Sequence, residues 1–379
     1  MKSRNTLKRT AGFICVMVLL LNGCSRKMPV NSVGNKPTAD NPIESTTIGE
    51  ESAVQELIEI TPTSTITELE KGLSIVRFDG DDGFATFLQN GGAASDAQVV
   101  QYLTKNLLHG ERGLSFSNLP FGCSTISADG EKGERLFGRN FDWYNCNALI
   151  VENHPEHGYS SLSTVNTDFI TQSAGRIGSI LLKDEVLTLA AIYAPLDGMN
   201  EKGLCVSVNM IQDSATINQN TDKPDITTTT AVRMLLNEAA NVDEAVKLLG
   251  DYDFHASFGY MVHLALSDRD GRSVVVEYVN DEMIVTDTPI VTNFYIAQGE
   301  KNGIGTQQSH KRFEILQEII QGGNQFSMEA VRDALERVSK HNFHDGETTE
   351  WSVVFNQTTG EAWYYHRENY DNQYCIVLD

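Results

Sequence analysis

Cys123-Ser-Thr-Ile-Ser-Ala128 and Gly138-Arg139-Asn140-Phe141-Asp142-Trp143 are two strand-like segments joined by the turn-rich residues 129–134. This pattern predicts an antiparallel hairpin with its turn centred near residues 131–132. Pairing about that centre sets Cys123 opposite about residue 140, which places Arg139 and Asp142 beside the thiol. A guanidinium favours the thiolate, the reactive form of cysteine. By themselves, these residues are more often a plain surface Arg–Asp pair and a small buried cysteine.

The rest of the chain after this hairpin contains strands and helices in separate blocks. Strand-like runs lie at residues 263–266, 273–278 and 283–286, with turn residues between them. Helical spacing of apolar residues is found instead at 230–240, 243–250, 310–321 and 327–340. Because the blocks do not alternate strictly, the pattern favours an α+β fold over a doubly wound parallel sheet.

The first 23 residues have the pattern of an export signal. Four basic residues precede the apolar run 11–21, which is about half the length that a membrane-spanning helix needs. The run ends in Leu21-Asn22-Gly23-Cys24, which resembles the lipobox of bacterial lipoproteins. We therefore expect a lipid on Cys24 and a place on the extracytoplasmic face of a bacterial cell membrane. Ordinary secretion, with Cys24 incidental, is the alternative.

Composition predicts a flexible tether before the folded part of the chain and argues against nucleic acid as a partner. Residues 25–64 are rich in Ser, Thr, Asn, Pro and Glu, which predicts a flexible tether. The formal net charge of −22 disfavours nucleic acid as a partner, because an acidic chain repels phosphate. The six cysteines are too sparse for a disulfide scaffold. No metal-ligand spacing is present, and we expect neither a metal nor another cofactor.

The hairpin and four later motifs resemble the choloylglycine hydrolase family of linear-amide hydrolases, which includes bile salt hydrolases and penicillin V acylases. Arg139 and Asp142 follow Cys123 by 16 and 19 residues, as in that family. The later motifs stand in the family's order: Asn200-Glu201-Lys202-Gly203-Leu204, Val208-Asn209, Val291-Thr292-Asn293 and Ser309-His310-Lys311-Arg312-Phe313. The segment between Leu204 and Asn209 is one residue shorter than in typical bile salt hydrolases.

The resemblance implies a fold and a set of catalytic roles. The fold is the four-layer αββα sandwich of N-terminal nucleophile hydrolases. The sulfur of Cys123 attacks an amide carbonyl and its α-amine, with a pKa of about 8, acts as the base. Asp142 holds that amine and Arg139 supports the thiolate. Asn293 and Asn209 donate to the oxyanion, and Arg312 organises the site from the far side.

The 122 residues before Cys123 distinguish this chain from bile salt hydrolases, which lose little more than Met to expose their cysteine. The arrangement resembles acid ceramidase and N-acylethanolamine acid amidase, relatives that cut themselves before the cysteine. We therefore expect cleavage between Gly122 and Cys123, since Gly readily adopts strained backbone conformations. The expected segments are a signal peptide (1–23), a lipid-attached tether (24–64), an upstream pro-segment (65–122) and the hydrolase domain (123–379).

The expected substrate is a small N-acyl amide, cleaved through a thioester. Two other functions remain open. An acyltransferase of the same family would pass the acyl group to an amine, using the same residues. A lipoprotein that binds a ligand without catalysis would retain the fold alone. Outside the resemblance, Asn293 also fits a turn residue after a strand, and Arg312 fits an exposed helix residue.

Overall fold

The computed structural model describes residues 63–108, 114, 122–171, 182–343 and 346–378. The predicted signal peptide, the lipidation residue Cys24 and nearly all of the predicted tether lie outside the described residues. The chain divides into two units, Met1–Ala53 and Val54–Asp379. The description below concerns the second unit.

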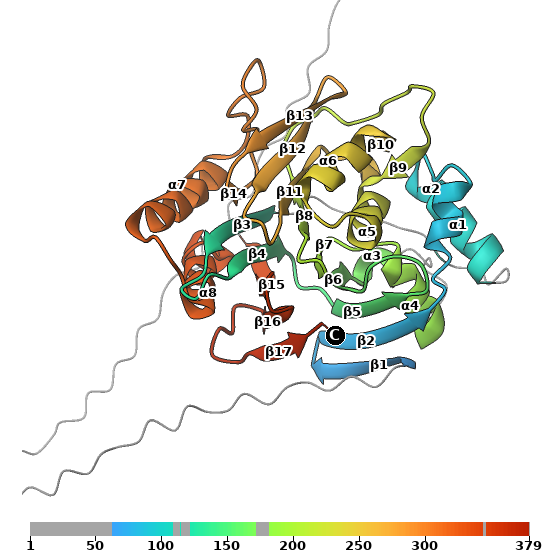
Figure 1. The fold of residues 1–379 in the computed structure, drawn as a ribbon, viewed down its shortest axis with the longest axis horizontal. Helices are drawn as coiled ribbons and strands as arrows, with labels where there is room; N and C mark the ends of the chain where they lie inside the picture. Colours follow the sequence, from blue (N-terminus) through green and yellow to red (C-terminus); the bar gives the residue numbers. More distant parts are fainter. Residues whose placement is uncertain (1–62, 109–113, 115–121, 172–181, 344–345, 379) are drawn as a thin grey trace, which may run out of the picture. The chain divides into compact units, whose positions relative to one another are not determined.

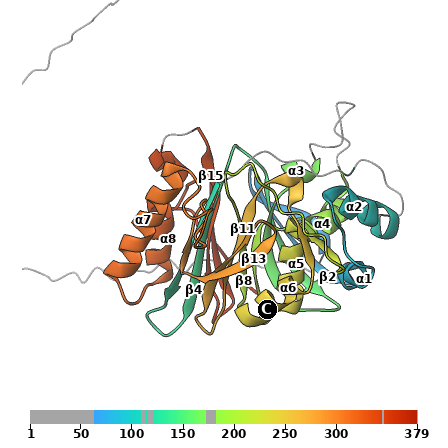
Figure 2. The same ribbon diagram turned by 90° about the horizontal axis from the view of Figure 1, so that it is seen from above.

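Two large β-sheets pack face to face, and helices cover the outer face of each (Figures 1 and 2). Helices α7 and α8 lie against the six-stranded sheet, through β3, β4, β14 and β15. Helices α4 and α5 lie against the nine-stranded sheet, through β1, β5, β7 and β8. The order helix, sheet, sheet, helix confirms the predicted α+β fold with four αββα layers.

The strands fall into three sheets. The nine-stranded sheet has the order β1 (Thr63–Glu70), β2 (Leu73–Gly80), β5 (Ala148–Pro155), β6 (Ser161–Asn166), β7 (Asp197–Asn200), β8 (Cys205–Met210), β11 (Val262–Ser267), β12 (Ser273–Val279), β13 (Glu282–Asp287). The six-stranded sheet has the order β14 (Ile290–Val291), β3 (Gly122–Asp129), β4 (Arg135–Trp143), β15 (Thr348–Asn356), β16 (Glu361–His366), β17 (Tyr374–Val377). A small parallel pair joins β9 (Asp225–Thr227) and β10 (Asp253–His255).

The helices of the described residues are short, except for α7. They are α1 (Phe84–Gln89), α2 (Asp96–Tyr102), α3 (Asp168–Thr171), α4 (Asp184–Ile192), α5 (Thr228–Glu238), α6 (Val242–Gly250), α7 (Gln307–Gly322) and α8 (Met328–Arg337). A π-helical turn, Leu103–Leu107, continues α2. Within the described ranges, no helix combines the length and apolar character needed to cross a membrane.

The hairpin predicted from the sequence is formed by β3 and β4. Cys123 pairs with Phe141, one residue beyond the predicted position, and Gly122 pairs with Asp142. The turn between the strands contains Gly133 at a positive φ of 86°. In the observed register Arg139 contacts the sulfur of Cys123, whereas Asp142 lies opposite Gly122.

Local signals also explain the neighbouring elements. Asn280 and Asp281 have φ angles of 53° and 63°, the left-handed pair that a tight hairpin turn between β12 and β13 requires. Asn241 caps α6, since its side chain accepts a hydrogen bond from the backbone N–H of Glu244. Thr306 caps α7 in the same way through the N–H of Ser309, and α7 carries Arg312.

The segment upstream of Cys123 forms part of the nine-stranded sheet. Strand β2 lies between β1 and β5 and pairs in parallel with β5 along its whole length, from Leu73 opposite Ala148 to Gly80 opposite Pro155. Its side chains Leu73, Ile75 and Val76 are buried in the core between the layers. The upstream segment is therefore attached to the rest of the fold by a strand pairing and by apolar contacts.

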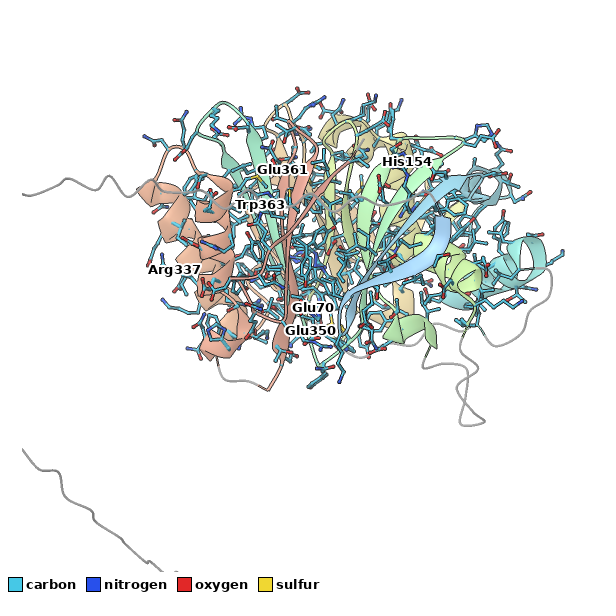
Figure 3. All side chains as sticks on the ribbon, turned by 90° about the horizontal axis from the view of Figure 1, so that it is seen from below. Glu70, His154, Arg337, Glu350, Glu361 and Trp363 are labelled. Carbon is cyan, nitrogen blue, oxygen red and sulfur yellow. The ribbon has the colours of Figure 1, made fainter. Side chains whose placement is uncertain are left out.

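Polar contacts attach the same segment to the other sheet. Glu70, the last residue of β1, pairs with His366 at 3.2 Å, and Arg367 pairs with Glu350 of β15 at 3.3 Å. Arg367 also donates to the carbonyl of Lys71. Figure 3 labels Glu70 and Glu350, which lie together on this side of the molecule. These contacts join the β1–β2 turn to the ends of β15 and β16.

Replacing Ile75 with Ala is expected to lower the free energy of unfolding by about 2–5 kcal/mol, because it leaves a cavity in the core. Glu68→Ala, on an exposed position of β1, is the matched control and is expected to change it by less than about 0.5 kcal/mol. Urea unfolding followed by circular dichroism measures both. Equal midpoints for the two variants would show that β2 is not part of the cooperative core.

Candidate active site

Cys123 is the second residue of β3 and its side chain is fully buried between the two sheets. Its Sγ lies 3.4 Å from Nη2 and 3.7 Å from Nη1 of Arg139. Its backbone N–H donates to Oδ1 of Asn293 at 2.9 Å. Both groups that an N-terminal cysteine would use in catalysis, the sulfur and the nitrogen, are therefore each held by one predicted site residue.

Arg139 is fixed on all sides by groups from both sheets. Its Nε pairs with the Asp197 carboxylate of β7 at 2.8 Å, and neither side chain is exposed. Its Nη2 also donates to the carbonyls of Val208 and Leu196, at 3.1 and 3.4 Å. The guanidinium lies 5.4 Å from the ring centre of Phe141. Because these contacts restrain the guanidinium, its position beside Sγ is set before any substrate arrives.

Arg312 connects the remaining predicted residues. Its Nη1 pairs with Oδ2 of Asp142 and its Nη2 donates to Oδ1 of Asn293 at 2.6 Å. The other carboxylate oxygen of Asp142 accepts from Thr349 Oγ1 at 2.7 Å. Arg312 is buried, so the alternative of an exposed helix residue is wrong. In the uncut chain, Asp142 reaches the nitrogen of Cys123 only through Arg312 and Asn293.

The two predicted oxyanion donors differ in their placement. Asn293 Nδ2 donates one hydrogen to the carbonyl of Met210 at 2.6 Å, which leaves its second hydrogen for another acceptor. Asn209 is buried on β8, where its Oδ1 accepts from Ser207 and its Nδ2 points to the carbonyl of Val291 at 3.4 Å. Asn293 thus contacts Cys123 directly, whereas Asn209 contacts Ser207 of its own strand and Val291 of β14.

Gly122 has little space for a side chain, and this constraint differs from the backbone strain that was expected. It lies in β3, outside the positive φ region, so the backbone does not demand glycine there. A Cβ at this position would lie 3.1 Å from Oδ2 of Asp142 and 3.2 Å from Cε of Lys340. The constraint on residue 122 is therefore the space beside Asp142 and not backbone strain.

Burial also changes the pKa of the Cys123 thiol. Removal from water raises the pKa of Cys123 to about 12, although the nearby Arg139 guanidinium acts in the opposite direction. The negative charge of Asp142 adds to the rise. At neutral pH the buried thiol of the uncut chain is protonated, so its proton must pass to another group when the sulfur attacks a carbonyl.

Sequence reasoning missed three residues that hold the site. Asp197 is the counterion of Arg139 and also accepts from Trp351 Nε1 at 2.9 Å. Thr349 donates to Asp142. Asp197 stands three residues before the recognised Asn200 motif, which offered a weak signal, whereas Thr349 and Trp351 lie in the C-terminal stretch where no motif was found.

The four cysteines among the described residues are all free and buried. Cys146, Cys205 and Cys375 form no disulfide with Cys123. Burial raises the pKa of each of these three thiols, which keeps them protonated. Cys123 differs from them in having a guanidinium at its sulfur.

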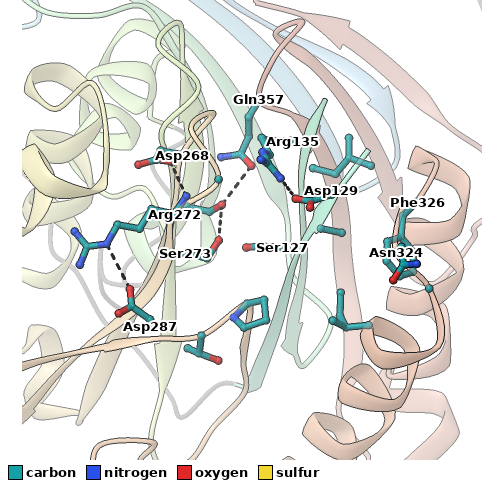
Figure 4. Close-up of a pocket in the computed structure, with 18 residues that line it drawn as sticks. Ser127, Asp129, Arg135, Asp268, Arg272, Ser273, Asp287, Asn324, Phe326 and Gln357 are labelled. Atoms are coloured by element: carbon teal, nitrogen blue, oxygen red, sulfur yellow. Dashed lines mark hydrogen bonds and ion pairs between the residues drawn. The ribbon is translucent and has the colours of Figure 1, made fainter. Parts of the chain in front are cut away.

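Two cavities lie at opposite ends of the β3–β4 hairpin. A polar one of about 250 Å³ adjoins Gly122 and is lined by Gln212, Asn293, Thr306, Gln308, Ser309, Arg312, Lys340 and Glu347. Another of about 490 Å³ lies near the hairpin turn and is shown in Figure 4. There Arg135 pairs with Asp129, and Arg272 with Asp287. The cavity at Gly122 is the one beside the predicted chemistry.

The described fold is a four-layer αββα sandwich in which Cys123 lies buried between the two sheets, in contact with Arg139 and Asn293. A solved structure of a mutant conjugated bile acid hydrolase from Clostridium perfringens superposes with a TM-score of 0.50, covering 68% of this chain and 92% of that one, at 17% identity. At this identity the similarity shows the fold alone.

Sequence comparison identifies one family whose model matches part of this chain. The model of the linear amide C–N hydrolases, choloylglycine hydrolase family, matches residues 123–294. A penicillin V acylase from Pectobacterium atrosepticum is 30% identical over 99 residues, which are 24% of this chain and 26% of that protein. A bile salt hydrolase/transferase from Clostridium perfringens is 27% identical over 177 residues, 44% of this chain and 51% of that protein. The chain thus matches about half or less of these relatives' length.

The predicted resemblance is confirmed: the model of the choloylglycine hydrolase family of linear amide C–N hydrolases matches residues 123–294. The matched range begins at Cys123 and ends just after Asn293, so it contains five of the six predicted catalytic residues. Arg312 lies beyond it and is connected to the site by its contacts with Asp142 and Asn293.

Replacing Asp197 with Ala is expected to lower the free energy of unfolding by about 3–5 kcal/mol, because it leaves Arg139 as an uncompensated buried charge. Asp287→Ala is the matched control. Its pair with Arg272 spans 3.4 Å, and its side chain is 78% exposed. The control is therefore expected to cost less than about 1 kcal/mol. Chemical denaturation measures both, and similar losses in the two variants would contradict the buried-pair interpretation.

Proposed function

We propose that this protein is an exported, lipid-anchored hydrolase that cleaves the linear amide bond of a small N-acyl substrate, with Cys123 as an N-terminal nucleophile. The observation that carries the proposal is the pair of contacts at Cys123. The Arg139 guanidinium lies at its sulfur, and Asn293 holds its nitrogen. The family relationship of residues 123–294 supports the type of bond attacked.

The proposed first step is cleavage of the chain between Gly122 and Cys123. The Cys123 sulfur attacks the carbonyl carbon of Gly122, the C–N bond breaks, and the thiol proton passes to the nitrogen. Water then hydrolyses the resulting thioester. The products are a carboxylate at Gly122 and a free amine and thiol on Cys123. The scissile N–H is already bound to Asn293 Oδ1.

This cleavage supplies the missing base. The raised pKa of the buried thiol keeps it protonated near neutral pH, and an α-amine with a pKa of about 8 on the same residue can accept its proton. The sulfur then attacks the substrate carbonyl, and the second hydrogen of Asn293 Nδ2 stabilises the oxyanion in this proposal. The ammonium returns its proton to the leaving amine, and water hydrolyses the acyl thioester.

The anchor is proposed from residues 1–24 alone. The basic start, the short apolar run and the Leu21-Asn22-Gly23-Cys24 sequence support export, followed by attachment of lipid to Cys24. The tether of residues 24–64 would hold the folded part away from the membrane surface. Fractionation of cells expressing wild type and Cys24→Ala tests this: the wild type is expected in the membrane fraction and the variant outside it.

Product analysis separates this function from the two alternatives. A hydrolase releases the free acid whether or not amines are added. An acyltransferase forms a new amide in proportion to the added amine. A ligand-binding lipoprotein gives neither product and shows no selectively reactive cysteine at a new N-terminus.

N-terminal sequencing of the purified protein is expected to find a chain that begins at Cys123, besides the upstream fragment. Cys123→Ser is expected to remain largely one chain and to lose amide hydrolysis by at least about 100-fold, because its hydroxyl is a poorer nucleophile than a thiolate. The two fragments of the wild type are expected to elute together on gel filtration, since β2 remains paired with β5.

A wild-type protein that stays in one piece and still hydrolyses amides would disprove the cleavage step. Full activity in Cys123→Ser would disprove the nucleophile. Cys375→Ser is the matched control, because that thiol is also buried and lies away from Arg139, and it is expected to be cut and to remain active.

Gly122→Val is expected to slow the cleavage by about 10- to 100-fold, because its Cβ would crowd Asp142 and Lys340 and shift the scissile bond. Gly322→Ala is the control, since a Cβ there meets no atom within 4 Å. Time courses of chain cleavage on denaturing gels measure both rates. Cleavage of Gly122→Val at the wild-type rate would show that space at residue 122 does not limit the reaction.

A further inference from the structure

Three polar side chains stand in a row across the inner face of the nine-stranded sheet. Asn209 of β8 pairs in register with His263 of β11, and His263 is hydrogen bonded to Glu277 of β12 at 3.0 Å. All three are fully buried. We call Asn209, His263 and Glu277 the polar row. Buried polar groups on adjacent strands are costly unless each finds a partner, so their partners indicate their role.

Apart from Ser207, which donates to Asn209, the partners of the polar row outside the row belong to the backbone that carries Asn293. Asn209 Nδ2 points to the carbonyl of Val291, and His263 Nε2 donates to the carbonyl of Thr292 at 2.7 Å. Glu277 accepts from the N–H groups of Ile296 at 3.0 Å and Ala297 at 2.5 Å. The row therefore holds this segment on both sides of Asn293.

The partners of His263 also define its protonation state. Nδ1 faces a carboxylate oxygen and Nε2 faces a carbonyl oxygen, and both of these groups only accept hydrogen bonds. If Glu277 is ionised, both ring nitrogens of His263 carry hydrogen, and the pair consists of an imidazolium and a carboxylate. Burial alone would raise the pKa of Glu277, but the hydrogen bond and charge of His263, with the two backbone amides, lower it overall.

We propose that His263 and Glu277 are positioning residues, a buried imidazolium–carboxylate pair that fixes the backbone on both sides of Asn293 and thereby the direction of its side-chain amide. The proposal rests on the proposed function, because it assigns the pair a part in that reaction. Their hydrogen bonds reach each other and the backbone of residues 292, 296 and 297, so they act through Asn293.

The geometry around Asn293 explains why its direction is sensitive. Its Oδ1 receives the N–H of Cys123 and Nη2 of Arg312, while its Nδ2 donates to Met210. If the amide rotated by a half turn, Nδ2, which is itself a donor, would face the donors of Cys123 and Arg312 and could accept from neither. A displacement of about 1 Å at such a site costs about 100-fold in rate. Fixing residues 292 and 296–297 therefore has a direct consequence for both the cleavage and the oxyanion.

Kinetic variants test the pair. His263→Gln and Glu277→Gln are expected to lower kcat, and the rate of chain cleavage, by about 10- to 100-fold with little change in KM. His255→Gln is the matched control: this histidine is also nearly buried, and its ring nitrogens are bound by Asn218 and Asp225. It is expected to lose stability but to keep kcat. Equal losses of kcat in all three variants would overturn the proposal.

A double variant separates positioning from a purely structural role. If the pair acts through Asn293, adding His263→Gln to Asn293→Ala is expected to cause no further fall in kcat beyond that of Asn293→Ala alone. A structural role predicts that the two losses multiply. Multiplied losses would therefore overturn the proposal, provided that melting curves show both proteins folded at the assay temperature.

Nitrogen NMR of the wild-type protein gives a readout independent of activity and of how the variants fold. With ¹⁵N-labelled histidine, both ring nitrogens of His263 are expected at the protonated shift at pH 7, assigned by the signals that His255→Gln and His263→Gln each remove. An unprotonated nitrogen on His263 would overturn the ion pair. If the wild type neither cuts itself nor hydrolyses amides, the proposed function fails, and this spectrum alone decides the pair.

Discussion

Two buried ion pairs hold the site together, and the rest of its geometry depends on them. Arg139 and Asp197 join β4 of one sheet to β7 of the other, and Arg312 with Asp142 joins α7 to β4. A buried charge that loses its partner costs several kcal/mol, so these elements cannot shift apart without a large penalty. The pairs are weak evidence for stability in themselves, but they fix where each guanidinium lies. Arg139 in turn contacts the sulfur of Cys123, and Arg312 contacts Asn293, which accepts from the nitrogen of Cys123.

The burial of Cys123 has two opposing effects. It removes water from the sulfur and strengthens the interaction with Arg139, but it also raises the pKa of the thiol to about 12. A guanidinium alone does not overcome that rise. An amine created on the same residue would solve the protonation problem locally, without a second side chain in a crowded core. The chain would therefore carry an assembled but silent site until the bond before Cys123 is cut.

Local signals in the sequence predicted the hairpins and helices, and distant contacts explain what was missed. Arg139 and Asp142 share a hairpin with Cys123, so the turn alone placed them beside the thiol, with an error of one residue in register. Asn293 and Arg312 were recognised only through the family resemblance. Thr349 donates to Asp142 from a position 207 residues further along the chain, and no local pattern in either strand predicts this contact. The reason for Gly122 was also invisible, because the atoms that crowd it belong to Asp142 and Lys340.

The two sheets supply different residues of the site, which explains how a cut chain could keep the site intact. The six-stranded sheet supplies Cys123, Arg139 and Asp142, while the nine-stranded sheet supplies Asp197 and the polar row that supports residues 291–297. The upstream strands β1 and β2 are added to the far edge of the nine-stranded sheet, and β5 and β6 separate them from β7. Their attachment is the pairing of β2 with β5 and not the peptide bond at Gly122. Breaking that bond changes the end of β3 alone, because every other contact that positions Cys123 comes from strands and helices downstream of it.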